Sequence, residues 1–180
     1  MHLFVTQFLK DLLWFTSSWA DTSKEMAGKY TYTEVRDARS GAHLYNTDHT
    51  PTGAITTFLM LAFAPFAIGE VARWLLINPV IALFGFSEIP FGSGVPALLT
   101  ASIGVGFLWY LAKVAYWIGL GFSGKTVEST APRTLGEILT PDPFSLFLVS
   151  RVPAFVIAPW LCLAIVVLVI SWVFSSLFGG

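Results

Sequence analysis

The sequence predicts an all-α membrane protein with three transmembrane helices, an N-terminal amphipathic helix and an interfacial or re-entrant first loop. Of the 180 residues, 55% are hydrophobic and 12% are charged, and the mean hydropathy is +0.71. Soluble domains contain about one quarter charged residues, so this composition indicates a protein embedded in a bilayer. Three apolar runs, 54–77, 96–120 and 152–177, each reach the length of about 20 residues that a helix needs to cross the hydrocarbon layer.

Residues 1–28 are expected to form the amphipathic helix. Apolar side chains recur at helical intervals and polar side chains fall between them. The two sets are Phe4, Phe8, Leu9, Leu12, Phe15 and Trp19 against Gln7, Lys10, Asp11, Ser17, Ser18 and Asp21. A secretory signal is not expected, because no Lys or Arg precedes the apolar core and Lys10 and Asp11 interrupt it. Such a helix either lies in the membrane interface or docks on a partner helix.

Residues 29–52 are predicted to be a polar segment in the cytoplasm. The alternation in YTYTEVR indicates a short strand, and turn-forming residues follow it. His43 and His49 lie close in sequence, with Asp48 beside the second, but zinc motifs use tighter spacing and a fuller ligand set. A surface loop is therefore favoured here, and no metal site is predicted.

Residues 78–95, between the first two crossings, read NPVIALFGFSEIPFGSGV. This stretch is too apolar for an ordinary outer loop, and proline and glycine interrupt it too often for a full crossing. It is expected to hug the membrane as an interfacial or re-entrant segment. Its backbone polar groups then need partners from protein or water, which predicts packing against other helices.

Residues 121–151 are predicted to be a cytoplasmic loop with a short helix, because Thr134 and Glu137 match a capping box. Lys and Arg occur in the N-terminal segment and in this second loop, but not in 78–95 or after the third crossing. The positive-inside rule then places the N-terminus and the second loop in the cytoplasm and the C-terminus outside, as three crossings require. A bacterial inner membrane is the expected location.

Three charged residues within the crossings, Glu70, Arg73 and Lys113, are candidates for a functional role. If the first helix enters the hydrocarbon near Ala54, Glu70 lies roughly 24 Å along it and the Glu70–Arg73 pair lies near the outer surface. The favoured interpretation is that Arg73 extends outward to water. If the helix tilts or starts later, the two residues form a buried pair facing another helix. Lys113 falls in an aromatic belt at the cytoplasmic end of the second helix.

Small residues in the second crossing predict a surface for helix packing. Ala97 and Ala101, and then Ser102 and Gly106, are pairs spaced four apart, which lets helices approach closely. We expect this seam to support assembly with other membrane helices.

The sequence contains no motif for catalysis or for cofactor binding. CxxCH, HExxH, GxSxG and a Gly-rich phosphate loop are all missing, and no histidine falls in a crossing. Cys162 is the only cysteine and is expected to pack in the core. No enzyme activity, cofactor or metal is predicted, and a net charge of -1 gives no basis for nucleic-acid binding.

The favoured function is that of a non-catalytic integral membrane subunit of a larger assembly, of the energy-converting or secretion type, that packs or recruits other subunits. Its expected partners are membrane lipid and other integral membrane subunits, or further copies of the same chain. The alternative is a small oligomeric transporter or channel with Glu70, Arg73 or Lys113 along a path. A third interpretation is quinone or lipid handling at residues of the aromatic outer loop, namely Phe84, Phe86, Glu88 and Phe91.

Overall fold

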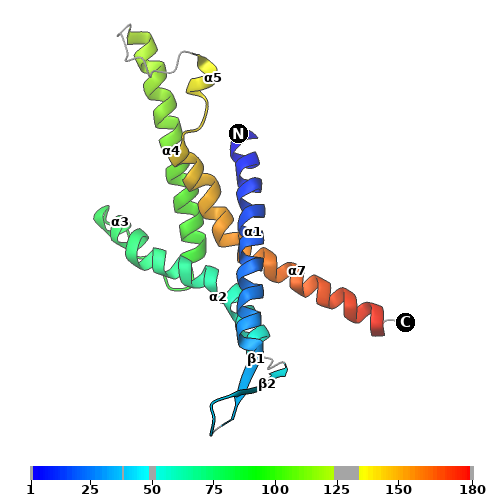
Figure 1. The fold of residues 1–180 in the computed structure, drawn as a ribbon. Coiled ribbons are helices and arrows are strands. Elements are labelled where there is room, and N and C mark those ends of the chain that lie inside the picture. The colour runs from blue at the N-terminus through cyan, green and yellow to red at the C-terminus, as the bar shows by residue number, and fades with distance from the viewer. Residues whose placement is uncertain (1, 38, 49–51, 124–133, 179–180) are drawn as a thin grey trace.

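The structure is a computed structural model that describes residues 2–37, 39–48, 52–123 and 134–178. Three helices are long and apolar enough to cross a membrane, namely Gly53–Leu83, Gly94–Phe122 and Pro143–Phe178. The N-terminal helix is also present, so the predicted fold class is confirmed (Figure 1). In chain order the elements are α1 (His2–Thr31), β1 (Tyr32–Arg36), β2 (His43–Asp48), α2 (Thr52–Ala72), η1 (Arg73–Ile77), α3 (Asn78–Leu83), α4 (Gly94–Ser123), α5 (Leu135–Ile138), α6 (Pro143–Leu146), η2 (Phe147–Arg151) and α7 (Val152–Phe178).

The first and third apolar helices each contain one turn of π-helix, η1 and η2, just before a proline. After η1, Asn78 donates its backbone N–H to the Arg73 carbonyl, five residues back, and Pro79 follows. A proline has no N–H with which to bond to the carbonyl of the preceding turn. A wider π turn just before the proline therefore removes no hydrogen bond that the helix would otherwise have made there. η2 stands in the same relation to Pro153.

The first and third apolar helices differ from their predicted boundaries. The first helix continues through 78–83, so that only 84–93 remain as the outer loop, because the π turn accommodates Pro79 within the helix. The third helix begins at Pro143 instead of 152, because the side chain of Asp142 caps it by accepting the Ser145 N–H. The sequence predicts a loop over 143–151 because Arg151 and Pro153 interrupt the apolar run there.

Helix α1 packs along α7, η2 and α2 of its own chain. The rings of Phe15 and Phe155 meet edge to face with centroids 5.2 Å apart, and the Ser150 hydroxyl donates to the Phe4 carbonyl over 3.3 Å. The predicted faces of this helix are wrong at two positions. Leu9 is 51% exposed, whereas Asp11 is only 8% exposed, because Asp11 turns toward polar groups on the packed side.

Several hydroxyl groups of α1 bond to the helix itself. Four of them donate to carbonyls three or four residues earlier, at 2.7 to 3.0 Å, and these belong to Thr16, Ser17, Thr22 and Ser23. A hydroxyl bonded in this way leaves no unpaired donor, so side chains that look polar in the sequence can lie in apolar surroundings. The hydroxyl pattern is therefore compatible with a position of α1 among the membrane helices.

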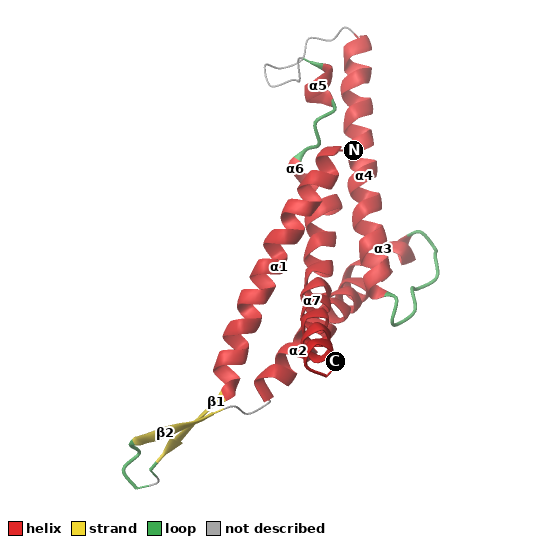
Figure 2. Cartoon of the chain, turned by 90° about the vertical axis from the view of Figure 1, so that its right-hand side faces the viewer, coloured by secondary structure: helices red, strands yellow, loops and turns green. Residues whose placement is uncertain are grey.

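Helix α7 passes through the middle of the molecule and then leaves it (Figures 1 and 2). Its buried side chains all belong to the first half, and they are Pro153, Ala154, Val156, Ala158, Pro159 and Cys162. The Trp160 ring N–H donates to the Ala62 carbonyl of α2 over 3.1 Å. Residues 164–178 are exposed throughout, so this apolar half of the helix is left for lipid or for another protein.

The polar segment forms a hairpin in which β1 pairs with β2 in antiparallel register, from Tyr32 opposite Asp48 to Arg36 opposite His43. The strand expected in YTYTEVR is therefore present. In the connecting turn, the Asp37 carboxylate accepts the Arg39 N–H and the Ser40 hydroxyl, and these hydrogen bonds lower the pKa of Asp37. His49 lies outside the described residues.

Candidate functional site: a polar clasp on the first apolar helix

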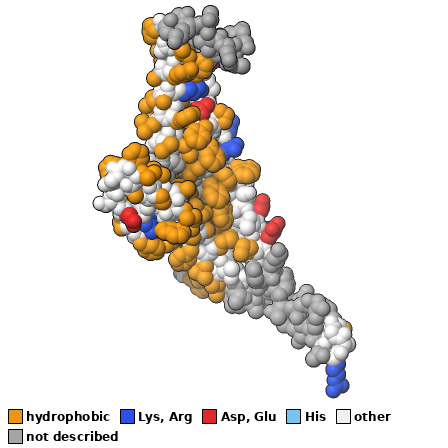
Figure 3. All heavy atoms as spheres, turned by 90° about the vertical axis from the view of Figure 1, so that its left-hand side faces the viewer, with side chains coloured by type: hydrophobic (Ala, Val, Ile, Leu, Met, Phe, Trp, Pro, Cys, Tyr) orange, Lys and Arg blue, Asp and Glu red, His pale blue; other side chains and the backbone are white. Residues whose placement is uncertain are grey.

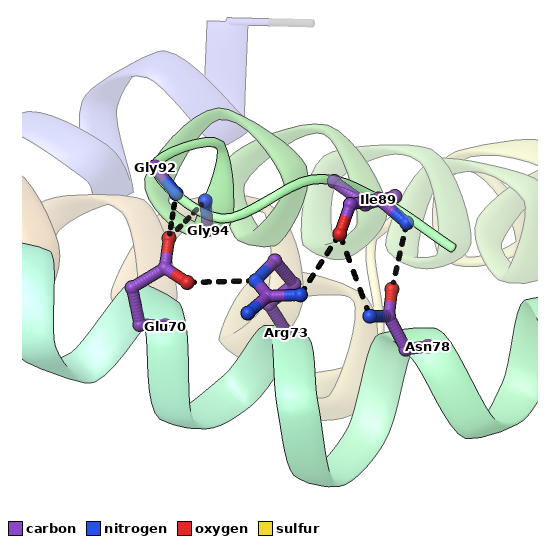
Figure 4. Close-up of polar contacts among 6 residues, drawn as sticks. All are labelled: Glu70, Arg73, Asn78, Ile89, Gly92 and Gly94. Carbon is purple, nitrogen blue, oxygen red and sulfur yellow. Dashed lines mark hydrogen bonds and ion pairs between the residues drawn. The ribbon is translucent and has the colours of Figure 1, made fainter.

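Glu70, from the first apolar helix, reaches the chain that leads into α4. Its Oε1 accepts the backbone N–H of Gly92 over 3.0 Å and that of Gly94 over 2.8 Å, while its Oε2 accepts the Nε–H of Arg73 over 2.7 Å (Figure 4). Gly94 is the first residue of α4, so the carboxylate lies at the positive end of that helix. Both oxygens of Glu70 are therefore paired, and its side chain is 10% exposed.

Arg73 and Asn78 hold the middle of the same loop. The Arg73 Nη1 donates to the Ile89 carbonyl over 2.8 Å, and the Asn78 Oδ1 accepts the Ile89 N–H over 3.0 Å (Figure 4). Side chains thus satisfy both backbone polar groups of Ile89, as a segment at membrane depth requires. We call this set the clasp: the side chains of Glu70, Arg73 and Asn78 with the backbone groups of Ile89, Gly92 and Gly94.

Two glycines bring the backbones of α2 and α4 into contact beside the clasp. A Cβ on Gly94 would lie 2.5 Å from the Gly69 oxygen and 2.6 Å from the Glu70 nitrogen, closer than real Cβ atoms come. Gly92 has φ +91°, a left-handed conformation that glycine adopts without strain. The residues around Glu70 therefore have to be small, and one of them has to be flexible in φ.

The clasp folds the chain back along the first apolar helix. Asn78, late in the helix, bonds to Ile89, and Glu70, two turns earlier, bonds to Gly92 and Gly94 at the end of the loop. The loop therefore runs antiparallel to the helix. Helix α4 consequently begins beside Gly69, in the middle of the first apolar helix and not beyond its end. We call residues 70–94 the clasped hairpin.

The fold-back at the clasp sets the direction in which α4 leaves it. From the clasp, α3 projects to the side while α4 runs to the top of Figure 1, and the β-hairpin and the end of α4 lie at opposite ends of the molecule (Figures 1 and 2). Successive crossings joined by a short loop alternate in direction, as the distribution of Lys and Arg also predicts. The membrane orientation of the chain therefore stays a prediction.

The interpretation favoured from sequence for Arg73, a side chain extended outward to water, is wrong in the structure. The Arg73 side chain is 13% exposed and turns inward to Glu70 and Ile89. The depth estimate assumed that the loop began at residue 78, but the helix continues and the loop comes back over it. The alternative, a buried pair, describes the geometry, although the pair faces a loop and a helix start.

Lys113 also bonds to its own chain. Its Nζ donates to the Thr140 carbonyl over 2.9 Å, and the Tyr110 hydroxyl donates to the Leu139 carbonyl over the same distance. These contacts tie α4 to the segment that follows α5. At the start of α5, the Thr134 hydroxyl oxygen caps the helix by accepting the Glu137 N–H over 3.2 Å. Lys113 thus joins α4 to the lead-in of the third apolar helix.

Asp142 follows this segment and caps the third helix. Burial raises the pKa of its carboxyl, but the hydroxyl of Ser145, 2.6 Å away, and the Ser145 N–H outweigh that effect, with a smaller contribution from the charge of Lys113. The pKa of Asp142 is therefore lowered, and the cap is charged at neutral pH.

The small-residue seam of α4 faces the same chain at Gly106. A Cβ on Gly106 would lie 2.8 Å from Leu148 Cβ and 2.8 Å from Val149 Cγ2, both in η2. Ser102 is buried, while Ala97 and Ala101 are half-buried. At Gly106 the close approach predicted from the spacing therefore serves intramolecular packing.

The aromatic residues of the outer loop point outward. Phe84, Phe86 and Phe91 are 69 to 76% exposed, and Glu88 is exposed as well. The Phe91 ring lies edge to face against Phe66, with centroids 5.6 Å apart. The face of the molecule toward which α3 projects is dominated by hydrophobic side chains, with few charges (Figure 3). The clasped hairpin therefore encloses the polar groups of the clasp and presents mainly apolar side chains on its outer surface.

Sequence reasoning identified Glu70 and Arg73 but missed Asn78, Gly92 and Gly94 as their partners. The available signal was the pair of glycines just before a predicted helix, opposite an intramembrane carboxylate. Among the described residues, no three His, Cys, Asp or Glu side chains come together to hold a metal ion. Comparisons with known protein families, with curated proteins and with solved structures found no match.

Proposed function

We propose that this protein is a non-catalytic integral membrane subunit of a larger assembly, and that the clasped hairpin contacts another membrane subunit. The observation that carries the proposal is an apolar groove of about 480 Å³ on the first apolar helix. It is lined only by Ala67, Ile68, Val71, Ala72, Leu75 and Leu76, none of which belongs to the clasp.

The groove has the properties of a helix-packing surface. Its alanines let a neighbouring backbone approach closely, which is how membrane helices associate in the absence of a hydrophobic driving force. Leu75 and Leu76 are 54% and 63% exposed, so this chain leaves them uncovered. This surface stays apolar because Glu70, Arg73 and Asn78 bond to the outer loop and the start of α4, and none of them lines the groove.

The remaining parts of the proposal rest on the sequence. The distribution of Lys and Arg supports an orientation with the N-terminus in the cytoplasm and the C-terminus outside, and the membrane we propose is a bacterial inner membrane. The assembly is of the energy-converting or secretion type. Membrane lipid covers the apolar surfaces that no subunit contacts.

Site-specific photo-crosslinking in cells tests the proposal. A photoreactive residue replaces Val71, which lines the groove and is 55% exposed, and a matched control replaces Phe122, which is 89% exposed on α4. We expect Val71 to give a discrete protein adduct that Phe122 does not give. Lipid adducts alone at both positions would contradict the proposal.

One observation favours the interpretation of lipid handling as a second candidate. The exposed Phe84, Phe86 and Phe91 are presented by a loop whose backbone is fixed by the clasp. Such a loop can hold aromatic rings against acyl chains or a quinone. An oligomeric transporter is less well supported, because Glu70, Arg73 and Lys113 all bond to groups of their own chain. Alanine at all three phenylalanines should abolish labelling of the loop by a photoreactive acyl chain.

A further inference from the structure

A second site lies between α1 and the third apolar helix, well separated in the chain from the clasp. A groove of about 420 Å³ is lined by Lys10, Asp11, Trp14, Phe15 and Arg151. It holds two basic side chains and one acidic side chain, so the net formal charge is +1 at neutral pH. None of these charged side chains takes part in the clasp or in the hydrogen bond between Lys113 and Thr140.

A mainly apolar groove adjoins this one. A second groove of about 380 Å³ shares Trp14 and Phe15 with the first, and its other walls are Ser18, Trp19, Thr22 and Phe155. The Thr22 hydroxyl is already bonded to the Ser18 carbonyl over 3.0 Å. The combined groove thus has a charged end and a longer wall made mainly of aromatic rings.

Asp11 positions the basic end. Its carboxylate is 11% exposed, accepts a hydrogen bond from the Gln7 amide over 2.9 Å, and lies 3.8 Å from the Nε of Arg151. Since Asp11 approaches the guanidinium at Nε, the terminal amino groups of Arg151 stay available, and the Arg151 side chain is 60% exposed. The Oδ2 of Asp11 is buried and has no partner in the described part of the chain, so it offers an acceptor to which a hydroxyl group of a bound headgroup can donate.

The position of the site along the third helix matches a lipid. Arg151 is the last charged residue before α7, whose 27 residues are all uncharged. The third apolar helix has 36 residues, more than the about 20 that a crossing needs, so α7 alone can span the hydrocarbon with Arg151 at its boundary, and the groove runs from Arg151 toward Phe155. Basic side chains at such a boundary attract anionic lipid.

We propose that this groove binds one glycerophospholipid, with its phosphodiester between Lys10 and Arg151 and an acyl chain along Phe15, Trp19 and Phe155. Two cations against one carboxylate favour an anionic headgroup over a net neutral one. Aromatic walls suit an acyl chain and do not suit a small soluble anion. The site is independent of the proposed subunit contact on the first apolar helix.

Native mass spectrometry of the full-length protein tests the site after delipidation in a mild detergent and titration with dioleoyl phosphatidylglycerol. Lys10 is exposed and makes no hydrogen bond in the described structure, so Lys10→Gln should leave the fold intact. We expect this variant to bind the lipid about fivefold more weakly, and Lys10→Gln with Arg151→Gln about 25-fold more weakly, from ~1 kcal/mol for each basic residue near a lipid surface. The matched control, Lys24→Gln with Arg39→Gln, removes two exposed charges outside the groove and should bind as the parent does.

Two further measurements identify the ligand. Dioleoyl phosphatidylcholine should bind more weakly than phosphatidylglycerol, and inorganic phosphate should not displace the bound lipid. Undiminished lipid binding by Lys10→Gln and by the double variant would refute the site. Displacement by inorganic phosphate would show a soluble-anion site and refute the lipid assignment.

Discussion

The Oε1 of Glu70 accepts the backbone N–H of Gly94 over 2.8 Å, joining two residues that are 24 positions apart and both buried. This contact ends the outer loop and starts α4 beside the middle of the first apolar helix. It gives an intramembrane carboxylate a structural role, because its acceptors are used by backbone donors and by Arg73. The charges that the sequence offers as a possible ion path are thus engaged in holding the fold.

Gly94→Ala should destabilise the protein. The new Cβ would lie 2.5 Å from the Gly69 oxygen, and backbone atoms cannot move away as a flexible side chain can. Overpacking of this kind costs about 1–3 kcal/mol. Thermal unfolding of the purified protein measures the loss. Gly104→Ala is the control in the same helix, since its Cβ would meet no atom within 4 Å and alanine favours the helix. Equal melting temperatures for the two variants would contradict the close contact.

Gly106→Leu should lower the melting temperature of the isolated chain. The added side chain would collide with Leu148 and Val149 of η2, so the damage should not depend on any partner. Gly119→Leu, on an open part of α4, is the control. If Gly106→Leu melts like the parent protein but no longer co-purifies with other subunits, the seam is instead an intermolecular surface.

The cap at Asp142 should make stability depend on pH. Its pKa is lowered in the folded state, so the stabilisation by the charged carboxylate is present above the ordinary aspartate pKa and is lost as the pH falls through the folded value. Asp142→Ala should cost about 1 kcal/mol at neutral pH, as removal of a helix N-cap does. Asp142→Asn keeps a neutral cap, so its melting temperature should approach that of the parent on acidification. If the melting temperatures of Asp142→Asn and the parent differ by the same amount from neutral to acidic pH, the charge of Asp142 has no role in the cap.

Membrane orientation can be tested with an impermeant thiol reagent on intact cells, in a Cys162→Ala background. A cysteine at Ser40 should be shielded and one at Ser87 should be labelled, because the charge distribution places the N-terminal segment inside. The reverse pattern would invert the orientation. A third cysteine at Ser129, outside the described residues, reports on the second crossing. The charge count predicts shielding there. Labelling at that position with shielding at Ser40 would instead put the β-hairpin and the end of α4 on opposite sides of the membrane, as they lie at opposite ends of the molecule in Figure 1.

Composition and periodicity were enough to predict the three apolar helices, the N-terminal helix and the strand near Val35, because these depend on residues close in sequence. Apart from the Glu70–Arg73 pair, the clasp depends on contacts across 11 to 24 positions, which no local pattern encodes. Pro79 reads as a helix breaker, and only a π turn lets the helix continue through it. A helical projection predicts a polar face for Asp11 because it does not include the contact of its carboxylate with Arg151 on the third apolar helix.

The most direct test of the clasp is hydrogen–deuterium exchange in a peptide covering residues 84–95, compared between Glu70→Leu and Glu88→Leu. Glu88 is an exposed acidic residue of the same loop whose side chain makes none of the hydrogen bonds of the clasp, so its variant is the matched control. If the Glu70 carboxylate holds the amides of Gly92 and Gly94, Glu70→Leu should raise deuterium uptake in this peptide while a peptide within α4 keeps its protection. Equal uptake in the two variants, with both proteins folded, would contradict the clasp.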